Sequence, residues 1–376
     1  MKQGWTYKKL EEVCDILDSQ RKPITKDKRE SGNIPYYGAT GCLDYVKDYI
    51  FDEKLVLLGE DGAKWGAGED SAYIITGKSW VNNHAHALRP KREIVIDELL
   101  VYYLNYANLQ SFITGVTVPK LNQEKMRSIL IPLAPLSEQK AIVSRLDSAF
   151  AKIDALKANA KKQLDDAKAL FQKALEKAME PKEGWEEKKL GEICEKSQNI
   201  NWKNIAEGMQ YTYIDLTSVD RNSLSIIAPQ FIDKTNAPSR AKQIIKKGDI
   251  IFATTRPTLR RLCLVSSSFD SQICSTGFCV LRPKQEIASK WIYYTLQYDK
   301  FYQYIEPLQT GASYPAVTDG IVKEFNIYFP SLSEQQAIVT RLDSLSENVK
   351  KLQEVLDKTI KECDALKQAM LRQVFE

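Results

Sequence analysis

The sequence lacks several features that would assign a chain to a known class. No run of about 18 or more apolar residues occurs, so we expect no membrane-spanning helix. The first residues, MKQGWTYKKLEEV, contain no apolar stretch that could act as a signal peptide. The 7 cysteines are scattered without a CxxC pair, which favours reduced thiols in a cytoplasmic protein over disulfides or a zinc site.

Motifs for phosphate and dinucleotide binding are also missing. TGKS at 76–79 resembles the end of a P-loop, but Ala72 stands where the first glycine of that motif belongs. No GxGxxG follows a predicted strand, and the Asn-Pro-Pro-aromatic motif of amino-methyltransferases does not occur. With only 2 histidines, acid–base chemistry would depend on carboxylates or lysines, and none stands in a recognisable constellation. We therefore predict a protein that is not an enzyme.

The 2 histidines, His84 and His86, lie close together in VNNHAHALRP. A His-x-His pair on a strand can ligate a metal ion, but the neighbouring residues offer no third ligand. The alternative is that both imidazoles share one face of a strand, where they could contact a ligand. We favour this alternative and predict no metal site.

What the composition does contain is typical of an ordinary globular protein. Hydrophobic residues make up 43% and charged residues 27% of the chain. A chain of 376 residues is long enough for two or three domains with proper cores. The net charge of +4 is compatible with a nucleic-acid partner but does not argue for one.

The chain contains an internal repeat. LSEQKAIVSRLDS at 136–148 returns as LSEQQAIVTRLDS at 332–344, with eleven of thirteen residues identical. Further matches pair GWTYKKLEEVCD (4–15) with GWEEKKLGEICE (184–195), LRPK (88–91) with LRPK (281–284), and TGVTVPKL (114–121) with TGASYPAV (310–317). Their constant order predicts two units, each a mixed α/β globule followed by a long helix.

Shorter matches predict individual elements of each globule. EKLVLL (53–58) and GDIIFA (248–253) are typical of buried strands, and YYLNY (102–106) and YTLQY (294–298) of aromatic-rich helices. Ser137 and Ser333, which follow proline-containing loops, are predicted to cap the long helices.

Both long helices carry apolar residues at heptad spacing. The predicted seams comprise Leu146, Ala149, Ile153, Leu156, Ala160, Gln163, Ala167, Leu170 and Ala174 in the first helix, and Leu342, Leu345, Val349, Leu352, Leu356, Thr359, Cys363, Leu366 and Met370 in the second. This spacing predicts helices that pack along their length. We favour pairing within the chain, although a bundle with other chains would show the same seams. About thirty paired residues would span roughly 45 Å, slightly more than one turn of B-DNA at about 34–36 Å.

The loops after the two matching strands differ, as recognition loops on a shared scaffold would. The first is GEDGAKWGAGED (59–70) and the second TTRPTLRRLCL (254–264). Arginine side chains suit guanine edges and phosphates, and threonines suit phosphates or thymine methyl groups. The DNA-contact candidates in this second loop are Thr254, Thr255, Arg256, Thr258, Arg260 and Arg261. A solvated turn with surface charges is the alternative.

Other loops supply further candidates for DNA contact. They are Lys64, Trp65, Asn82, Asn83, His84, His86, Thr117 and Lys120 in the first half, and Arg240, Lys242, Ser313 and Tyr314 in the second. Asparagine amides can read adenine, although turn formation explains Asn82 and Asn83 equally well.

Together these motifs resemble the specificity subunit of type I restriction-modification systems. The resemblance rests on PLSEQKAIVSRLD (135–147), LSEQQAIVTRLD (332–343), KLNQEKMRSILIPL (120–133), GWEEKKLGEIC (184–194) and the two LRPK segments. It covers essentially the whole chain in the order globule, helix, globule, helix.

The resemblance implies an α+β fold with two mixed α/β target recognition globules in tandem repeat. Two long helices, which pair as an antiparallel coiled coil, would separate them. The implied boundaries are 1–135 and 181–331 for the recognition domains, and 136–180 and 332–376 for the spacer helices.

The resemblance also implies a function and partners. Each globule would read half of a split double-stranded DNA target, with a spacer set by the helices, and unlike loops predict an asymmetric target. The helices would dock two methyltransferase subunits, which bind S-adenosylmethionine and methylate adenine N6. Translocase subunits that use ATP and Mg would join in the restriction complex, whereas this chain would bind no cofactor itself. The candidate docking residues are Lys140, Arg145, Gln336 and Arg341.

Two other classes of function compete with this interpretation. A non-catalytic coiled-coil scaffold that binds proteins would also carry unlike loops on like globules. An enzyme, such as a nuclease or a fused methyltransferase, would need catalytic motifs that the sequence lacks.

Overall fold

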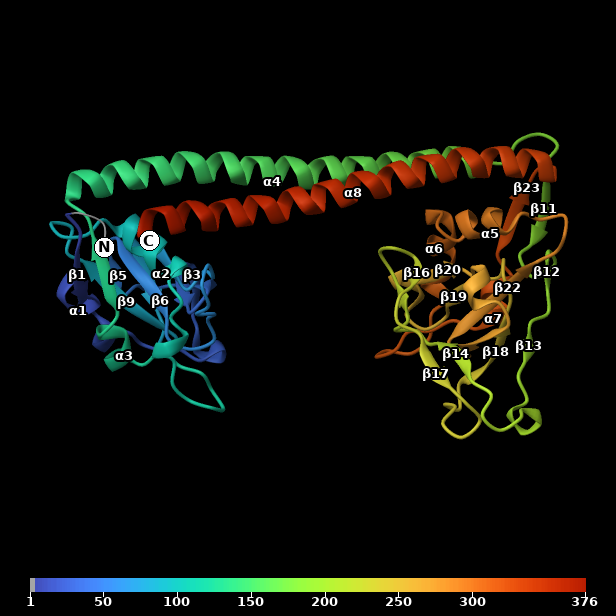
Figure 1. Cartoon of the computed structure of the whole chain (residues 1–376), viewed down its shortest axis with the longest axis horizontal. Helices are drawn as coiled ribbons and strands as arrows, with labels where there is room; N and C mark the ends of the chain where they lie inside the picture. Colours follow the sequence, from blue (N-terminus) through green and yellow to red (C-terminus); the bar gives the residue numbers. More distant parts are fainter. Residues whose placement is uncertain (1–3) are drawn as a thin grey trace. The chain divides into compact units, whose positions relative to one another are not determined.

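The computed structural model describes residues 4–376 and divides into two compact units. The first unit contains Met1–Lys161 and Leu356–Glu376, and the second contains Lys162–Val355. Each unit therefore combines one globule with parts of both long helices (Figure 1).

The first globule contains two four-stranded sheets and a two-stranded ribbon. One sheet, in the order β2-β9-β6-β7, consists of β2 (Cys14–Ile16), β6 (Leu55–Gly59), β7 (Ala72–Ile75) and β9 (Ala85–Pro90). The other, in the order β4-β3-β8-β5, consists of β3 (Ser31–Gly38), β4 (Gly41–Val46), β5 (Phe51–Asp52) and β8 (Lys78–Val81). The ribbon joins β1 (Thr6–Lys9) to β10 (Leu130–Leu133), and the helices are α1 (Leu10–Val13), α2 (Asp97–Tyr106) and α3 (Gln123–Arg127).

The second globule contains counterparts of the β2-β9-β6-β7 sheet and of the ribbon. Its four-stranded sheet, in the order β12-β22-β19-β20, consists of β12 (Cys194–Glu195), β19 (Ile250–Ala253), β20 (Leu262–Leu264) and β22 (Phe278–Pro283), and its ribbon joins β11 (Glu186–Lys189) to β23 (Asn326–Phe329). A five-stranded sheet, in the order β13-β18-β21-β14-β17, consists of β13 (Gln198–Asn199), β14 (Tyr211–Ile214), β17 (Gln230–Ile232), β18 (Ala241–Ile245) and β21 (Gln272–Ser275). The hairpin strands are β15 (Val219–Asp220) and β16 (Ser225–Ile226), and the helices are α5 (Ser289–Thr295), α6 (Asp299–Ile305) and α7 (Asp319–Lys323).

The two central strands confirm the predicted buried strands. Every residue of β6 and of β19 is buried, and each strand lies between two antiparallel neighbours. Burying a strand on both faces accounts for its nearly continuous apolar sequence. The aromatic-rich helix is confirmed at α2, but its counterpart α5 ends at Thr295, so only part of the segment 294–298 is helical.

The long helices are α4 (Leu136–Met179) and α8 (Leu332–Phe375), each 44 residues in length. Both begin one residue before the serine that was predicted to cap them. In α8 the residue that caps the helix is Ser331, whose Oγ accepts a hydrogen bond from the Glu334 backbone N–H at 3.4 Å. The predicted capping positions were therefore wrong by about two residues, a common uncertainty at helix ends.

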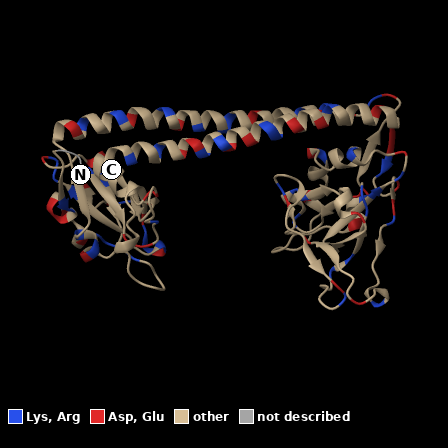
Figure 2. Ribbon diagram, viewed as in Figure 1, with Lys and Arg blue, Asp and Glu red and all other residues tan. Residues whose placement is uncertain are grey.

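The two helices run antiparallel where they pair within the first unit. Lys157 Nζ lies 2.6 Å from Asp364 Oδ1, and Asp154 pairs with Lys367, so the chain directions are opposed. Charged residues of both signs are distributed along both helices (Figure 2). Within residues 4–376, no helix is long and apolar enough to cross a membrane.

The heptad period of the seams is confirmed, but its phase in α4 was only half right. Buried positions of α4 include Leu146, Ile153 and Ala160, as predicted. Leu156 and Leu170 were predicted to face the seam and are instead 50% and 61% exposed.

The residues next to these leucines occupy the interior. Phe171 is 8% exposed and Leu164 is half-buried, each one position after a predicted seam residue. In α8 the prediction holds at Leu342, Leu356 and Cys363, whereas Leu366 is 51% exposed.

Candidate nucleic-acid interface

Two of the predicted recognition loops of the second globule lie side by side. Thr255 forms an isolated β-bridge with Ala316, and the Arg256 backbone N–H donates to the Pro315 carbonyl at 2.6 Å. The Arg256 guanidinium lies 4.7 Å from the centre of the Tyr314 ring, and its Nη2 donates to the Ser313 carbonyl at 3.1 Å. Arg256, Ser313 and Tyr314, which the sequence places far apart, therefore form one surface.

The backbone of the Arg256 loop has an unusual conformation. Arg256 and Arg260 have φ angles of 49° and 56°, in the left-handed region, on either side of the single turn Pro257–Leu259. Non-glycine residues adopt this region rarely, and such strain concentrates at functional sites. The conformation supports a recognition role for this loop over that of an ordinary solvated turn.

The three arginines of this loop have different environments. Arg260 pairs with Asp299 at 2.7 Å and lies 4.1 Å from the centre of the Tyr302 ring. Arg261 is half-buried and donates from Nη1 to the Leu216 carbonyl at 3.2 Å. Arg256 is exposed, and it lies over the exposed ring of Tyr314. It is therefore the best placed of the three to meet a ligand.

The corresponding loops of the first globule are also adjacent. Lys120 forms isolated bridges with Asp61 and with Thr114, which closes the loop at 114–120. His84 Nδ1 pairs with the Asp61 carboxylate at the edge of this loop. The exposed predicted residues nearby are Lys64, Asn83, His84 and Thr117, whereas Lys120 is half-buried.

Four predicted contact residues lie in the interior and cannot reach DNA directly. Trp65 is 5% exposed and donates from Nε1 to the Gly59 carbonyl at 3.0 Å. Asn82 accepts the His84 backbone N–H, which is the turn role named as its alternative, and Thr254 donates to the Gly277 carbonyl. His86 is the fourth. All four were placed wrongly because the sequence does not show which side of a loop or of a strand faces the core.

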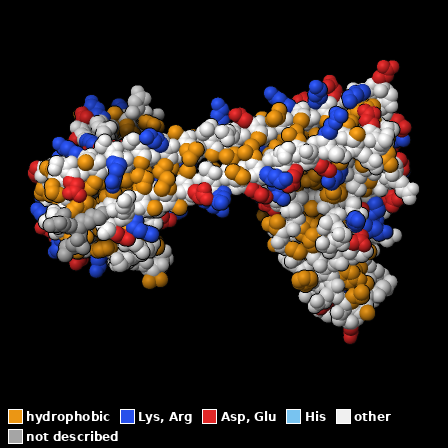
Figure 3. Space-filling model, turned by 45° about the horizontal axis from the view of Figure 1, so that its top comes forward, with side chains coloured by type: hydrophobic (Ala, Val, Ile, Leu, Met, Phe, Trp, Pro, Cys, Tyr) orange, Lys and Arg blue, Asp and Glu red, His pale blue; other side chains and the backbone are white. Residues whose placement is uncertain are grey.

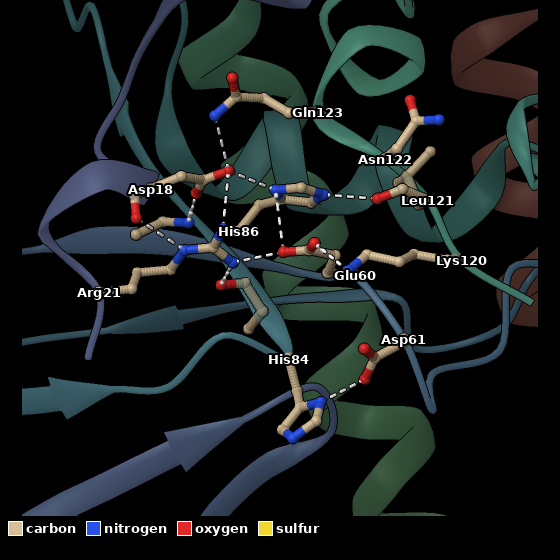
Figure 4. Close-up of polar contacts among 12 residues, drawn as sticks. Asp18, Arg21, Glu60, Asp61, His84, His86, Lys120, Leu121, Asn122 and Gln123 are labelled. Carbon is tan, nitrogen blue, oxygen red and sulfur yellow. Dashed lines mark hydrogen bonds and ion pairs between the residues drawn. The ribbon is translucent and has the colours of Figure 1, made fainter. Parts of the chain in front are cut away.

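The two histidines do not share a strand face. Strand β9 begins at Ala85, so His84 precedes it, and the side chain of His84 is 50% exposed while that of His86 is fully buried. His86 instead contacts Asp18 and Glu60, and ligand atoms of these three residues lie within 4.8 Å of one another (Figure 4). Two potential ligands therefore lie beside His86, but they come from distant parts of the sequence, and His84 is not in the group.

Cations of the chain itself already neutralise these carboxylates. Arg21 Nη1 lies 2.6 Å from Glu60 Oε2, and Lys120 Nζ lies 2.7 Å from Glu60 Oε1. Arg21 Nη2 and Gln123 Nε2 approach Asp18 Oδ2 at 3.2 and 3.0 Å. Because these groups use the oxygen lone pairs, the donor set fits an ion-pair network better than a metal site.

The pKa values of both carboxyl groups agree with this description. Burial alone would raise the pKa of Asp18, but the hydrogen bond from His86 and the charges of His86 and Arg21 bring it below its usual value. Burial likewise acts to raise the pKa of Glu60, and Lys120 and Arg21 reverse the direction. Because the pKa values of Asp18 and Glu60 are lower in the folded than in the unfolded state, both groups stabilise the folded state at a pH above their unfolded pKa values. This contribution is lost as the pH falls through the folded-state pKa values.

The repeated LSEQ phrase contains a buried glutamine in each unit that the sequence alone did not single out. Gln139 is 0% exposed, accepts the Ile96 N–H at 3.0 Å, and donates to the carbonyls of Ile94 and Ala134 at 2.9 and 2.8 Å. It joins the start of α4 to the segment before α2.

Gln335 repeats this arrangement in the second unit. It is also 0% exposed, accepts the Ala288 N–H at 2.9 Å, and donates to the carbonyls of Glu286 and Pro330 at 3.3 and 3.0 Å. The phrase is therefore needed twice because each helix is fastened to its globule by the same side chain.

The LRPK segments also have a structural explanation. Arg282 donates from Nε and Nη2 to the two carboxylate oxygens of Asp249, at 2.9 and 2.7 Å, in a buried pair. Arg89 makes the same two-pronged contact with Glu53, at 2.7 Å for each bond. Each LRPK arginine thus ties its own strand, β9 or β22, to the residues just before the neighbouring strand, β6 or β19.

The predicted docking residues lie on exposed faces of the two helices. Lys140, Arg145, Gln336 and Arg341 are all exposed. Two unpredicted residues join them, because Leu170 and Leu366 occupy equivalent repeat positions and are both exposed, at 61% and 51%. Hydrophobic side chains are visible along the helices in Figure 3.

Two globules that share one four-stranded sheet and a ribbon, with unlike loops and equivalent helices, define a tandem-repeat recognition protein. The chain belongs to the type I restriction-modification DNA specificity family, because the model of the type I restriction modification DNA specificity domain matches residues 2–166 and again 182–362. It is therefore a DNA-recognition subunit of a type I restriction-modification system.

Individual relatives agree with this assignment. A Haemophilus influenzae protein named a putative type I restriction enzyme specificity subunit is 39% identical over 142 residues, which cover 38% of this chain and 36% of that protein. The MjaVIII specificity subunit of Methanocaldococcus jannaschii is 21% identical over 96% of this chain and 91% of its own.

Solved structures share the fold over the whole chain. One, described as the structural basis of complex assembly and conformational transition of the type I R-M system, has a TM-score of 0.72 at 19% identity, covering 100% of this chain and 98% of its own. The HsdS subunit of Thermoanaerobacter tengcongensis has a TM-score of 0.54 at 18% identity, covering 100% and 97%.

Proposed function

We propose that this chain reads an asymmetric bipartite DNA target, with one globule for each half-site and no catalytic activity of its own. The observation that carries the proposal is that two globules built on equivalent four-stranded sheets, β2-β9-β6-β7 and β12-β22-β19-β20, display chemically different loops. Scaffold positions such as Gln139 and Gln335 match between the halves, whereas the loops that follow β6 and β19 do not. Each globule would consequently prefer different bases.

The second globule would contact DNA through its arginine and tyrosine surface. Exposed members of this surface are Thr258, Arg256, Ser313 and Tyr314, with Arg240 and Lys242 as further exposed cations and Thr255 half-buried beside them. Arginine can contact guanine edges or phosphates, and an aromatic ring can stack on a base or pack against a sugar. Arg260 and Arg261 would chiefly shape this surface, because Asp299 neutralises Arg260 and Arg261 is half-buried.

The first globule would use a chemically different surface. Its loop at 114–120 presents Val116 and Val118, which are 103% and 64% exposed, next to Thr117. Apolar side chains can pack against thymine methyl groups. A carboxylate such as Asp61 can accept a hydrogen bond from the amino group of cytosine. Lys64 and Lys120 are cations in the vicinity.

The proposal predicts a bipartite adenine-methylated motif with two unlike halves. A methylation map by long-read sequencing would compare the host with a strain that lacks this chain, with the methyltransferase partner expressed in both. We expect one such motif to disappear, which would also reveal the spacer. A palindromic motif would contradict the asymmetry, and an unchanged methylome would favour a protein-interaction scaffold.

Replacing Arg256 with alanine should weaken DNA binding by the complex about tenfold. If the side chain contacts a phosphate, the slope of log K against log salt should also fall by about 1. Arg260→Ala is the matched control, since Asp299 and Tyr302 already bind that guanidinium, and it should change both quantities less. Equal effects of the two substitutions, or an unchanged affinity in Arg256→Ala, would place Arg256 away from the DNA.

The two long helices would dock two methyltransferase subunits that bind S-adenosylmethionine. The proposal rests on the equivalent exposure of Leu170 and Leu366, one in each unit, because two copies of one partner need two copies of one contact site. Lys140, Arg145, Gln336 and Arg341 would form the polar part of these sites. Translocase subunits that use ATP and Mg would join the same assembly in a restriction complex.

A further inference from the structure

Beneath the recognition loops of the first globule lies a buried polar network centred on His86. It joins four segments of the chain: the turn at Asp18–Arg21, the end of β6 at Glu60, His86 on β9, and the loop end at Lys120–Leu121 (Figure 4). Asp18, Glu60 and His86 are 9%, 8% and 0% exposed. A cluster this rich in ionisable groups is costly to bury unless every member is paired.

Both ring nitrogens of His86 face hydrogen-bond acceptors. Nδ1 lies 2.6 Å from Asp18 Oδ2, and Nε2 lies 2.7 Å from the Leu121 carbonyl oxygen. A carbonyl cannot donate, and the Asp18 carboxylate also accepts hydrogen bonds from the Ala87 N–H and Gln123 Nε2. Nε2 therefore donates to the Leu121 carbonyl and Nδ1 faces the Asp18 carboxylate, so the imidazole holds the turn and the loop together from opposite sides.

The network fixes the places where two recognition loops begin and end. The Glu60 carbonyl accepts the Leu121 N–H at 2.8 Å, while the Glu60 carboxylate binds Arg21 and Lys120. Arg21 also donates to the Ala85 carbonyl at 2.7 Å, next to His84. Movement of His86 would therefore be transmitted to the loop at 59–70, the loop at 114–120 and the His84–Asp61 pair.

The second globule lacks this network at the equivalent positions. Leu58 pairs with His86 in the first sheet, and Phe252 pairs with Cys279 in the second, so Cys279 stands in the place of His86. Thr254 likewise replaces Glu60, because its carbonyl accepts the Val317 N–H at 2.9 Å. The scaffold evidently forms with a buried cysteine at this place.

We infer that His86 is a positioning residue for recognition of one half-site, acting through the loops that its network anchors. This inference rests on the proposed function and adds that the two globules hold their loops by different means. A change at His86 should relax base discrimination in the half-site read by the first globule. The other half-site and the spacer should be unaffected.

The test uses His86→Cys, which introduces the residue found at the same place in the second globule. The full complex with its methyltransferase partner would be expressed in cells carrying a plasmid library in which each half-site is randomised in turn, and methylated sites would be sequenced. We expect discrimination at one half-site to fall about tenfold and the other to match wild type. Asp18→Asn, a nearly isosteric change, should relax the same half-site and serves as the second variant if His86→Cys does not fold.

Each other outcome has a definite meaning. If the folded variants discriminate as well as wild type at both half-sites, or relax both equally, the inference is overturned. If dialysis against EDTA relaxes the wild-type complex and added zinc restores it, the cluster is a metal site and the inference also fails. A wild-type complex without sequence-specific methylation would instead remove the proposed function itself.

Discussion

Replacing Gln335 with leucine should lower the free energy of unfolding of the second unit by about 3 kcal/mol, because buried polar groups left without partners cost about 1–3 kcal/mol each. Leucine has a similar volume, but it cannot pair with the Ala288 N–H or the carbonyls of Glu286 and Pro330. No water can reach these groups readily, since Gln335 is 0% exposed. Denaturant unfolding of the full chain, with both transitions followed, measures the effect.

The neighbouring residue supplies a matched control. Gln336 is exposed, so Gln336→Leu should change the free energy of unfolding by no more than about 0.5 kcal/mol. The same comparison applies in the first unit to Gln139→Leu and the exposed Lys140→Leu. If both members of a pair destabilised the chain equally, the buried hydrogen bonds would not be the reason that the phrase is repeated.

Replacing both Leu170 and Leu366 with glutamate should abolish binding of both methyltransferase partners. A charge in the centre of an apolar contact typically costs at least about 2 kcal/mol, which weakens binding about 30-fold or more at each site. Each single variant should therefore retain one partner and the double variant none. The mass of the purified complex, measured by native mass spectrometry, distinguishes these compositions.

Adjacent alanines provide the controls for this second experiment. Ala169 and Ala365 are exposed, occupy equivalent repeat positions, and lie about 100° around the helix from the leucines. Ala169→Glu and Ala365→Glu add the same charge without removing either leucine, and both should retain two partners. A double leucine variant that still bound two partners would show that docking uses other residues.

Much of the fold could be predicted because its sequence signals are local and occur in both repeats. The repeat established two equivalent units, continuous apolar runs marked β6 and β19, and heptad spacing marked α4 and α8. These signals lie within short segments, where a side chain's neighbours in sequence are also its neighbours in space. The family resemblance rests on the same segments.

Local patterns could not predict which residues of α4 face the seam. Positions separated alternately by three and four residues fit a heptad in either order, so Leu170 and Phe171 were equally compatible with the interior. The tertiary structure buries Phe171 against Tyr294, with ring centres 6.3 Å apart, and leaves Leu170 exposed. Only the packing partner, more than a hundred residues away, decides between the two.

The candidate interface was predicted only in part, because packing against distant segments decides which loop residues are buried. The differing loops could be recognised from the sequence, and most of their polar residues are exposed. Trp65, Asn82, His86 and Thr254 are buried because distant segments of the chain pack over them, and the local sequence does not reveal these contacts.

The sequence by itself determined the repeat, the long helices and the class of protein, because these depend on periodicity and on motifs within single segments. The tertiary structure decided which loop residues reach the surface and which leucines of the long helices face solvent. It also assembled Asp18, Glu60 and His86 into one network, although Asp18 and His86 lie 68 residues apart in the chain. Burial and ion pairing depend on distances in space, and only the folded chain sets those distances.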